Sequence, residues 1–262
     1  DFSGKPPDDA TPPTDSPRIR PSHAGTLVVV GLAMAITVAT TQYLYSQSPG
    51  KRIITVLSDE QNIALDLYDY PVLTEAGLQP EVAAEHVIVF SDYTCPHCRD
   101  SHAIIKQARE SHADDTAWII AIVPLSEECN PNIERTHFVA KHACDYARLA
   151  MAVWVHDPDA FEQLHGWLFD GPAPPKLDEV RAKVASTLGV ESLDAVLDDP
   201  RVTAQLDRQI ALSEKLRAYR MPSFVLNGSM FQGPPRTPGE FGKWLYNAKR
   251  HRLATDNATD AQ

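Results

Sequence analysis

The motif Cys95-Pro96-His97-Cys98 stands between a segment with strand character and a segment with helical character. Residues 86–93 are mostly β-branched and aromatic, which favours a strand. Residues 99–111 repeat apolar side chains at helical spacing. The two cysteines therefore lie at the start of a helix that follows a strand, and only some folds place two thiols there.

This position predicts different roles for the two thiols. Unpaired backbone N–H groups and the helix dipole at the N-terminus favour a thiolate at Cys95. Cys98 lies one turn further into the helix. We therefore expect Cys95 to be the exposed nucleophile and Cys98 the buried resolving thiol of a redox-active pair. Pro96 suits the first helical turn, which needs no N–H from it.

The surrounding pattern predicts a mixed α/β domain over residues 60–250. A strand, a helix and a near-continuous apolar strand follow one another, which indicates a right-handed crossover. A block of helices over about 130–217 then interrupts the pattern, and a hairpin turning at Asn227-Gly228 follows it. The expected strands cover 63–67, 87–90 and 117–124, the hairpin covers 223–231, and a last helix covers 241–250.

The residues before this domain have a different composition. Residues 1–23 are rich in proline and poor in apolar side chains, which predicts a disordered linker. Residues 24–46 carry no formal charge and as a helix would cover about 33 Å, enough for one transmembrane span in contact with membrane lipid. A cleaved signal peptide is the alternative, but the run ends without a small-x-small cleavage pattern. Residues 47–59 are expected to be a connector and 251–262 a polar tail.

The order of these elements resembles the thioredoxin fold, and the Cys-Pro-His-Cys motif with a large helical insertion resembles its DsbA-like branch. The resemblance implies an α/β thioredoxin-like domain, here preceded by one transmembrane helix. Met221-Pro222 stands where that family places a cis-proline, although Tyr219 and Arg220 differ from the family's usual residues. The resemblance implies a cis Pro222 beside Cys95 and a Met221 backbone that pairs with an extended substrate.

A second, narrower resemblance is to the thioredoxin-like domains fused to bacterial vitamin K epoxide reductase homologues. It rests on the segments 125–130, 142–144 and 150–154, which contain Cys129 and Cys144. In those fusions a membrane domain passes electrons to quinone. The resemblance implies a vitamin K epoxide reductase-like or other membrane redox partner, with quinone involved only through that partner and no cofactor bound directly. A reductase domain ahead of Asp1 is one possibility that it leaves open.

Cys129 and Cys144 form the remaining pair of cysteines. A structural disulfide between them would close a loop of about 15 residues and stabilise the fold by roughly 3 kcal/mol in the chain-entropy model. A relay that passes electrons to or from Cys95 and Cys98 is the alternative. We expect no metal site, because structural zinc ligands come in close-spaced pairs and Cys129 and Cys144 are far apart. Several histidines have no ligand spacing and are expected on helix surfaces, namely His102, His112, His156 and His165.

These features together predict a membrane-anchored, extracytoplasmic thiol–disulfide oxidoreductase. The net charge of −11 and the lack of a basic stripe argue against nucleic-acid binding. The favoured activity is oxidation of cysteines in exported proteins, because paired cysteines outside a membrane suit an oxidising compartment such as the periplasm. A reductase or isomerase supplied by a membrane electron carrier is the second possibility. A membrane-anchored chaperone or binding module without turnover is the third.

His97 is expected to support catalysis, because an imidazole beside the Cys95 thiolate can carry a compensating charge. Replacing it by proline or glycine should make the Cys95–Cys98 pair more reducing. The equilibrium of each variant with glutathione measures this change, and an unaltered redox potential in His97→Gly would exclude the role.

Overall fold

The computed structural model describes residues 53–57, 62–66, 69–75 and 78–259. Within these ranges, no helix combines the length and the apolar character that crossing a membrane requires. The predicted linker at 1–23 and the predicted transmembrane helix at 24–46 both lie outside the described residues.

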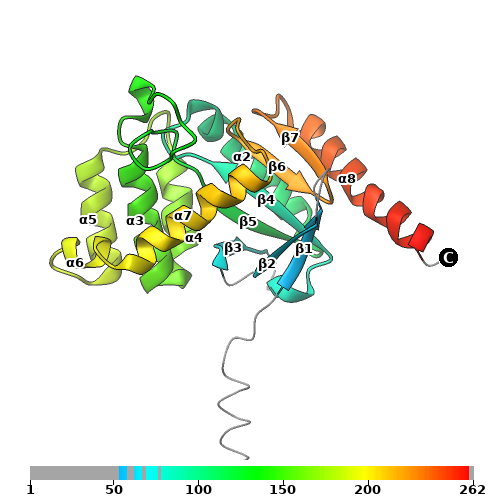
Figure 1. Cartoon of the computed structure of the whole chain (residues 1–262), viewed down its shortest axis with the longest axis horizontal. Coiled ribbons are helices and arrows are strands. Elements are labelled where there is room, and N and C mark those ends of the chain that lie inside the picture. The colour runs from blue at the N-terminus through cyan, green and yellow to red at the C-terminus, as the bar shows by residue number, and fades with distance from the viewer. Residues whose placement is uncertain (1–52, 58–61, 67–68, 76–77, 260–262) are drawn as a thin grey trace, which may run out of the picture. The chain divides into compact units, whose positions relative to one another are not determined.

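A five-stranded sheet forms the centre of the domain (Figure 1). Its strand order is β3 (Val72–Leu73), β5 (Thr116–Ile122), β4 (Glu85–Ser91), β6 (Ser223–Leu226) and β7 (Ser229–Gln232). The central strands β4 and β5 run parallel, and all other neighbours pair antiparallel. Every residue of β5 is buried, as its uninterrupted apolar sequence predicted.

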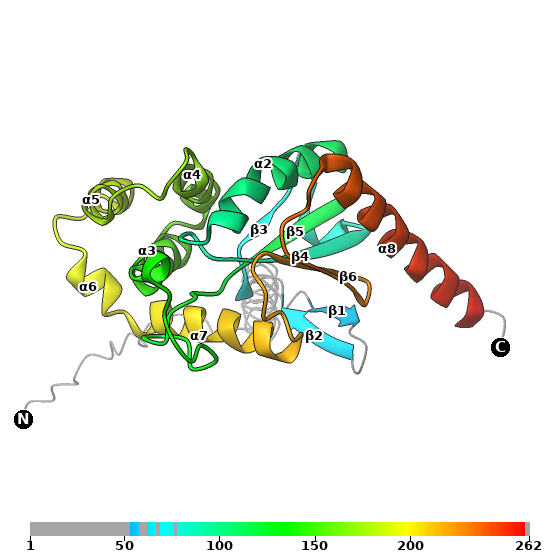
Figure 2. The ribbon, with the colours of Figure 1, turned by 90° about the horizontal axis from the view of Figure 1, so that it is seen from above.

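Helix α2 (Pro96–Ser111) connects β4 to β5, so the predicted strand–helix–strand crossover is confirmed. Figure 2 shows α2 and the start of α8 (Pro238–Thr259) on one face of the sheet and α7 (Pro200–Lys215) along the other. Phe241, Leu245 and Ala248 of α8 are buried. The sheet is therefore covered on both faces, and the end of β4 presents the redox motif at its edge.

Two of the predicted boundaries are wrong. Strand β1 (Ile53–Leu57) lies within the expected connector 47–59 and pairs antiparallel with β2 (Asn62–Asp66) in a separate two-stranded sheet. Its β-branched sequence favours an extended strand, and β2 supplies the partner. Helix α8 continues to Thr259 and so includes most of the expected polar tail 251–262. Residues 251–259 contain no proline or glycine that would end a helix.

The helical insertion is present, but its regular helices begin later than expected. Residues 125–142 form a loop that contains one short 3-10 turn, η3 (Phe138–Ala140). Another 3-10 turn, η2 (Pro80–Val82), precedes β4. Pro131 and the turn-forming Asn130 and Asn132 prevent a helix there. The helices are α3 (Ala143–His156), α4 (Pro158–Phe169), α5 (Leu177–Leu188) and α6 (Asp194–Leu197), followed by α7. Helix α3 packs against α4, α5 and α7 and forms the centre of the block.

One buried amide joins α7 to the sheet. The Gln209 side chain is fully buried, and its Oε1 accepts a hydrogen bond from the Ile122 N–H at 2.6 Å. Its Nε2 lies 2.8 Å from Sδ of Met151 on α3. An unpaired buried N–H costs about 1–3 kcal/mol, so this contact stabilises the position of α7 against the end of β5.

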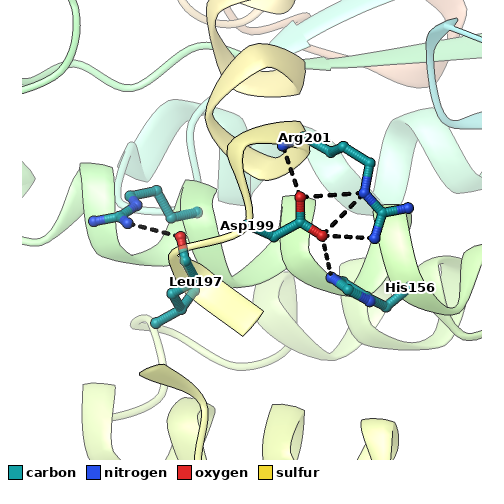
Figure 3. Close-up of polar contacts among 5 residues, drawn as sticks. His156, Leu197, Asp199 and Arg201 are labelled. Atoms are coloured by element: carbon teal, nitrogen blue, oxygen red, sulfur yellow. Dashed lines mark hydrogen bonds and ion pairs between the residues drawn. The ribbon is translucent and has the colours of Figure 1, made fainter. Parts of the chain in front are cut away.

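The start of α7 is held by a carboxylate that contacts the side chains of Arg201 and His156 (Figure 3). Asp199 is the N-cap of α7, and its Oδ1 accepts from the Arg201 N–H at 2.9 Å. Its Oδ2 lies 2.6 Å from the Arg201 guanidinium and 3.2 Å from Nε2 of His156, the last residue of α3. The side-chain and backbone hydrogen bonds from Arg201 lower the pKa of Asp199 to about 2.

Asp199→Asn should lower the stability of the domain at neutral pH, because asparagine keeps the cap but loses the ion pair with Arg201. The depressed pKa stabilises the fold above the ordinary aspartate pKa near 4, and this contribution is lost as the pH falls through about 2. Urea unfolding of the wild-type protein and of Asp199→Asn between pH 2 and pH 6 measures the difference in their free energies of unfolding. The difference should be largest above pH 4 and should disappear near pH 2. Asp198→Asn is the matched control, since Asp198 is the exposed neighbour, and an equal loss in that variant would contradict the assignment.

Candidate active site

Cys95 lies where β4 gives way to α2, and it caps that helix. It is the N-cap residue, with extended backbone angles, and its Sγ accepts a hydrogen bond from the Cys98 N–H at 3.4 Å. The thiol therefore satisfies one of the free N–H groups of the first turn. Pro96 occupies the first helical position, as expected. Both Pro96 and His97 are exposed, so the outer side of the motif faces solvent.

The two thiols have opposite electrostatic environments. The side-chain hydrogen bond with Cys98 is the main cause that lowers the pKa of Cys95, and the N–H groups of Cys98 and His97 add to it. Burial raises the pKa of Cys98 well above its usual value, and its contact with Cys95 raises it further. Cys98 is 1% exposed and Cys95 only 5%, so the expected exposed nucleophile is largely covered in this structure. The two thiols differ little in exposure, and what distinguishes them is that Cys95 lies at the N-terminus of α2.

The loop before β6 lies against Cys95. The Met221–Pro222 peptide bond is cis, and the Cys95 thiol donates to the Met221 carbonyl at 3.8 Å. The Pro222 carbonyl accepts from the Gly233 N–H at 2.8 Å, so this loop also holds the chain beyond β7. The structure thus brings together the dithiol and the dipeptide that the sequence predicted beside it, although they are separated by more than 120 residues.

Asp92 is a buried carboxylate that the sequence analysis missed. It is 1% exposed, and its Oδ1 accepts from the Thr94 N–H and the Thr94 hydroxyl, both at 2.5 Å. Its Oδ2 accepts from the Leu125 N–H at 2.6 Å. Burial raises the pKa of Asp92 in spite of these contacts. The carboxyl group fixes the turn before Cys95 to the chain beyond β5. In the sequence, only the position of Asp92 between the end of a strand and the Cys-Pro-His-Cys motif could have indicated this role.

A second group of contacts joins the redox motif to helix α4. The Tyr93 hydroxyl lies 3.0 Å from Nδ1 of His165, and both residues are buried. The expectation of a position on a helix surface is wrong for His165, whereas His102 is half-buried on α2. His165 is 5% exposed, and burial lowers its pKa well below the usual value. His102 stacks on the ring of Phe169, and burial lowers its pKa to about 4.

Cys129 and Cys144 are joined by a disulfide with an S–S distance of 2.11 Å and a Cα–Cα distance of 5.9 Å. The bond ties the loop after β5 to the first turn of α3. This is the arrangement that a structural bridge requires, and the relay alternative stays a prediction. In the ranges that the structure describes, no three His, Cys, Asp or Glu side chains come together as a metal site would need.

Comparison with known proteins identifies this arrangement. Residues 86–239 match the DSBA-like thioredoxin domain, a range that extends from β4 to the start of α8 and includes the dithiol, the cis-proline and the whole insertion. The match covers more than half of the chain. The chain belongs to this family.

Solved structures show the same DsbA-like fold. The catalytic domain of Proteus mirabilis ScsC gives a TM-score of 0.54 at 19% identity, covering 70% of this chain and 90% of that one. A thioredoxin-like oxidoreductase from Silicibacter pomeroyi gives 0.54 at 21% identity, covering 70% and 96%. Proteus mirabilis ScsC in a transitional conformation gives 0.54 at 17% identity, covering 87% and 91%. No curated protein sequence matches this chain.

As a DsbA-like protein with both thiols of its motif present, the chain is a thiol–disulfide oxidoreductase. Its chemistry requires a thiolate that attacks or leaves at Cys95 and a second thiol close enough to exchange with it. The cap of α2 supplies both conditions.

The reduced DsbA-like domain should be alkylated at Cys95 at a lower pH than an ordinary thiol requires, because the pKa of Cys95 is lowered. Cys98 should react slowly, because burial raises its pKa. Iodoacetamide labelling from pH 5 to pH 9, followed by peptide mass analysis, measures both rates. In the Cys95→Ser control the remaining Cys98 should stay nearly unlabelled. Equal labelling of the two thiols at pH 6 would contradict the asymmetry.

Proposed function

We propose that this protein is an extracytoplasmic thiol–disulfide oxidase that forms disulfide bonds in exported proteins. The observation that carries the proposal is the hydrogen-bonded Cys95 thiol at the N-terminus of α2, beside the cis-proline loop. Groups that stabilise the Cys95 thiolate stabilise the reduced protein, and a protein with a stabilised reduced form is a stronger oxidant.

The reaction begins from the Cys95–Cys98 disulfide. A substrate thiolate attacks Sγ of Cys95, and Cys98 leaves as a thiolate that takes up a proton. A second substrate thiolate then attacks the substrate sulfur of this mixed disulfide, and Cys95 leaves as a thiolate. The substrate loses two electrons and gains a disulfide, while this protein gains two electrons and becomes the dithiol.

The cis-proline loop is proposed to hold the substrate during this exchange. The Met221 carbonyl already contacts the Cys95 thiol, so an extended peptide that pairs with the Met221 backbone would place its own cysteine close to Sγ of Cys95. Recognition through the backbone would admit cysteine-containing proteins of varied sequence.

The location and the electron acceptor are further parts of the proposal. The charge-free segment 24–46 would anchor the domain to a membrane, and the Cys129–Cys144 disulfide suits an oxidising compartment such as the periplasm. A vitamin K epoxide reductase-like or other membrane partner would accept the two electrons and pass them to quinone. The reverse arrangement, in which a membrane carrier supplies electrons to a reductase or isomerase, uses the same site chemistry.

The redox potential of the Cys95–Cys98 pair separates an oxidase from a thioredoxin-like reductase. Equilibration of the full chain with glutathione, with Cys129 and Cys144 intact, should give a potential well above the thioredoxin value of about −270 mV. A potential near that value would exclude the oxidase.

A trapping experiment tests turnover separately. Cys98→Ala should accumulate mixed disulfides with reduced substrate proteins, because the resolving thiol is absent. Cys95→Ser should accumulate none and serves as the control. Non-reducing electrophoresis separates the two outcomes, and the absence of adducts in both variants would favour a binding module without turnover.

A further inference from the structure

Arg99 follows Cys98 directly and is the least expected group beside the dithiol, because it is a buried cation. The residue is 8% exposed, whereas arginine is almost never fully buried without a partner of opposite charge. Its backbone N–H donates to the Cys95 carbonyl at 3.1 Å, the first hydrogen bond of α2. The backbone of Arg99 is therefore hydrogen-bonded to the redox motif independently of its side chain.

The guanidinium of Arg99 joins the motif to the inserted helices through neutral partners. One nitrogen donates to the Tyr93 carbonyl at 2.8 Å, and another donates to the carbonyl of Asp170, the C-cap of α4, at 3.3 Å. The guanidinium carbon lies 5.6 Å from the centre of the Phe169 ring. The end of α4 and an aromatic face both favour a positive charge here.

No carboxylate neutralises this charge directly. Within the described part of the chain, Arg99 forms no ion pair, whereas the equally buried Arg109 pairs with both Glu75 and Glu162. Burial lowers the pKa of Arg99, and the largest opposing influence comes from Tyr146 rather than from Asp170 and Asp100, which are exposed to water. The charge of Arg99 also interacts with a Cys98 thiolate.

We infer that Arg99 is a positioning residue of the redox centre, whose uncompensated buried charge favours the thiolate-bearing reduced form of the dithiol. The reduced pair carries a negative charge when Cys95 is a thiolate, and the disulfide carries none. The Arg99 cation donates to the Tyr93 carbonyl, two residues before Cys95, and its position there favours the reduced form over the oxidised form. It also favours Cys98 as the leaving thiolate when a substrate attacks Cys95.

This role also makes the redox centre depend on the inserted helices. The guanidinium stays in place because the Asp170 carbonyl and the Phe169 ring, both at the end of α4, hold it there. The inference concerns the dithiol chemistry alone, so it stands whether the protein oxidises or reduces its substrates in the cell.

Two substitutions separate the charge of Arg99 from its hydrogen bonds. Arg99→Gln keeps a donor but removes the charge, and Arg99→Lys keeps the charge but cannot bridge the same two carbonyls. In glutathione buffers, the ratio [GSH]²/[GSSG] at which half of the protein is reduced should rise roughly tenfold in Arg99→Gln, equivalent to one pKa unit of thiolate stabilisation. In Arg99→Lys it should stay close to the wild-type ratio.

Arg148 provides the matched control. Its guanidinium also donates to a carbonyl at a helix end, that of Leu197 at 3.0 Å, and it belongs to the helical block rather than to the redox motif. Arg148→Gln should reduce thermal stability and leave the glutathione ratio unchanged. If Arg99→Gln does not fold, Arg99→Met is the substitute, because it avoids a buried polar head and carries the same expectation.

The inference fails if the uncharged variants keep the wild-type glutathione ratio, or if Arg99→Lys shifts the ratio as much as Arg99→Gln. Either result would make Arg99 a purely structural link between α2 and α4. A failure of this kind is distinct from a failure of the proposed oxidase. The oxidase depends on the absolute potential of the wild-type protein, and the inference depends only on differences among variants.

Discussion

The hydrogen bond from the Cys98 N–H to Sγ of Cys95 is the contact on which the chemistry of this protein depends. Most helices begin with an oxygen as the capping acceptor, and here a sulfur takes that place. A thiolate is a better acceptor than a thiol, so the end of α2 stabilises the charged form of the residue that must react. The same contact leaves Cys98 one turn inside the helix, where burial favours the protonated form.

A cap of this kind can act only if the turn before it is fixed, and two buried polar groups fix it. Asp92 binds the turn to the chain beyond β5, and Arg99 binds it to the end of α4. The Asp92 carboxyl group and the Arg99 guanidinium hold the turn from different elements. Both side chains have hydrogen-bond partners, and interactions within a buried polar network are strong only when its members are satisfied.

The sequence was informative where the structure is local. The helix start at Pro96, the crossover from β4 to β5 and the hairpin at Asn227 each follow from neighbouring residues. The roles of Asp92, Arg99 and His165 could not be predicted in this way, because each side chain also has a distant partner, 33, 71 and 72 residues away along the chain respectively. The cis bond before Pro222 was expected only through the resemblance to DsbA-like proteins, since an isolated Met-Pro pair favours trans.

The helical insertion is therefore more than a cover for the sheet. Its helix α7 reaches the end of β5 through Gln209, and its helix α4 reaches the redox motif through Asp170, Phe169 and His165. A redox centre with only a helix N-terminus beside it would have the partial charge that any helix provides. On the role inferred for Arg99, the insertion supplies a second source of thiolate stabilisation, because the end of α4 binds the Arg99 guanidinium. Changes in how α4 packs would alter that stabilisation without altering either cysteine.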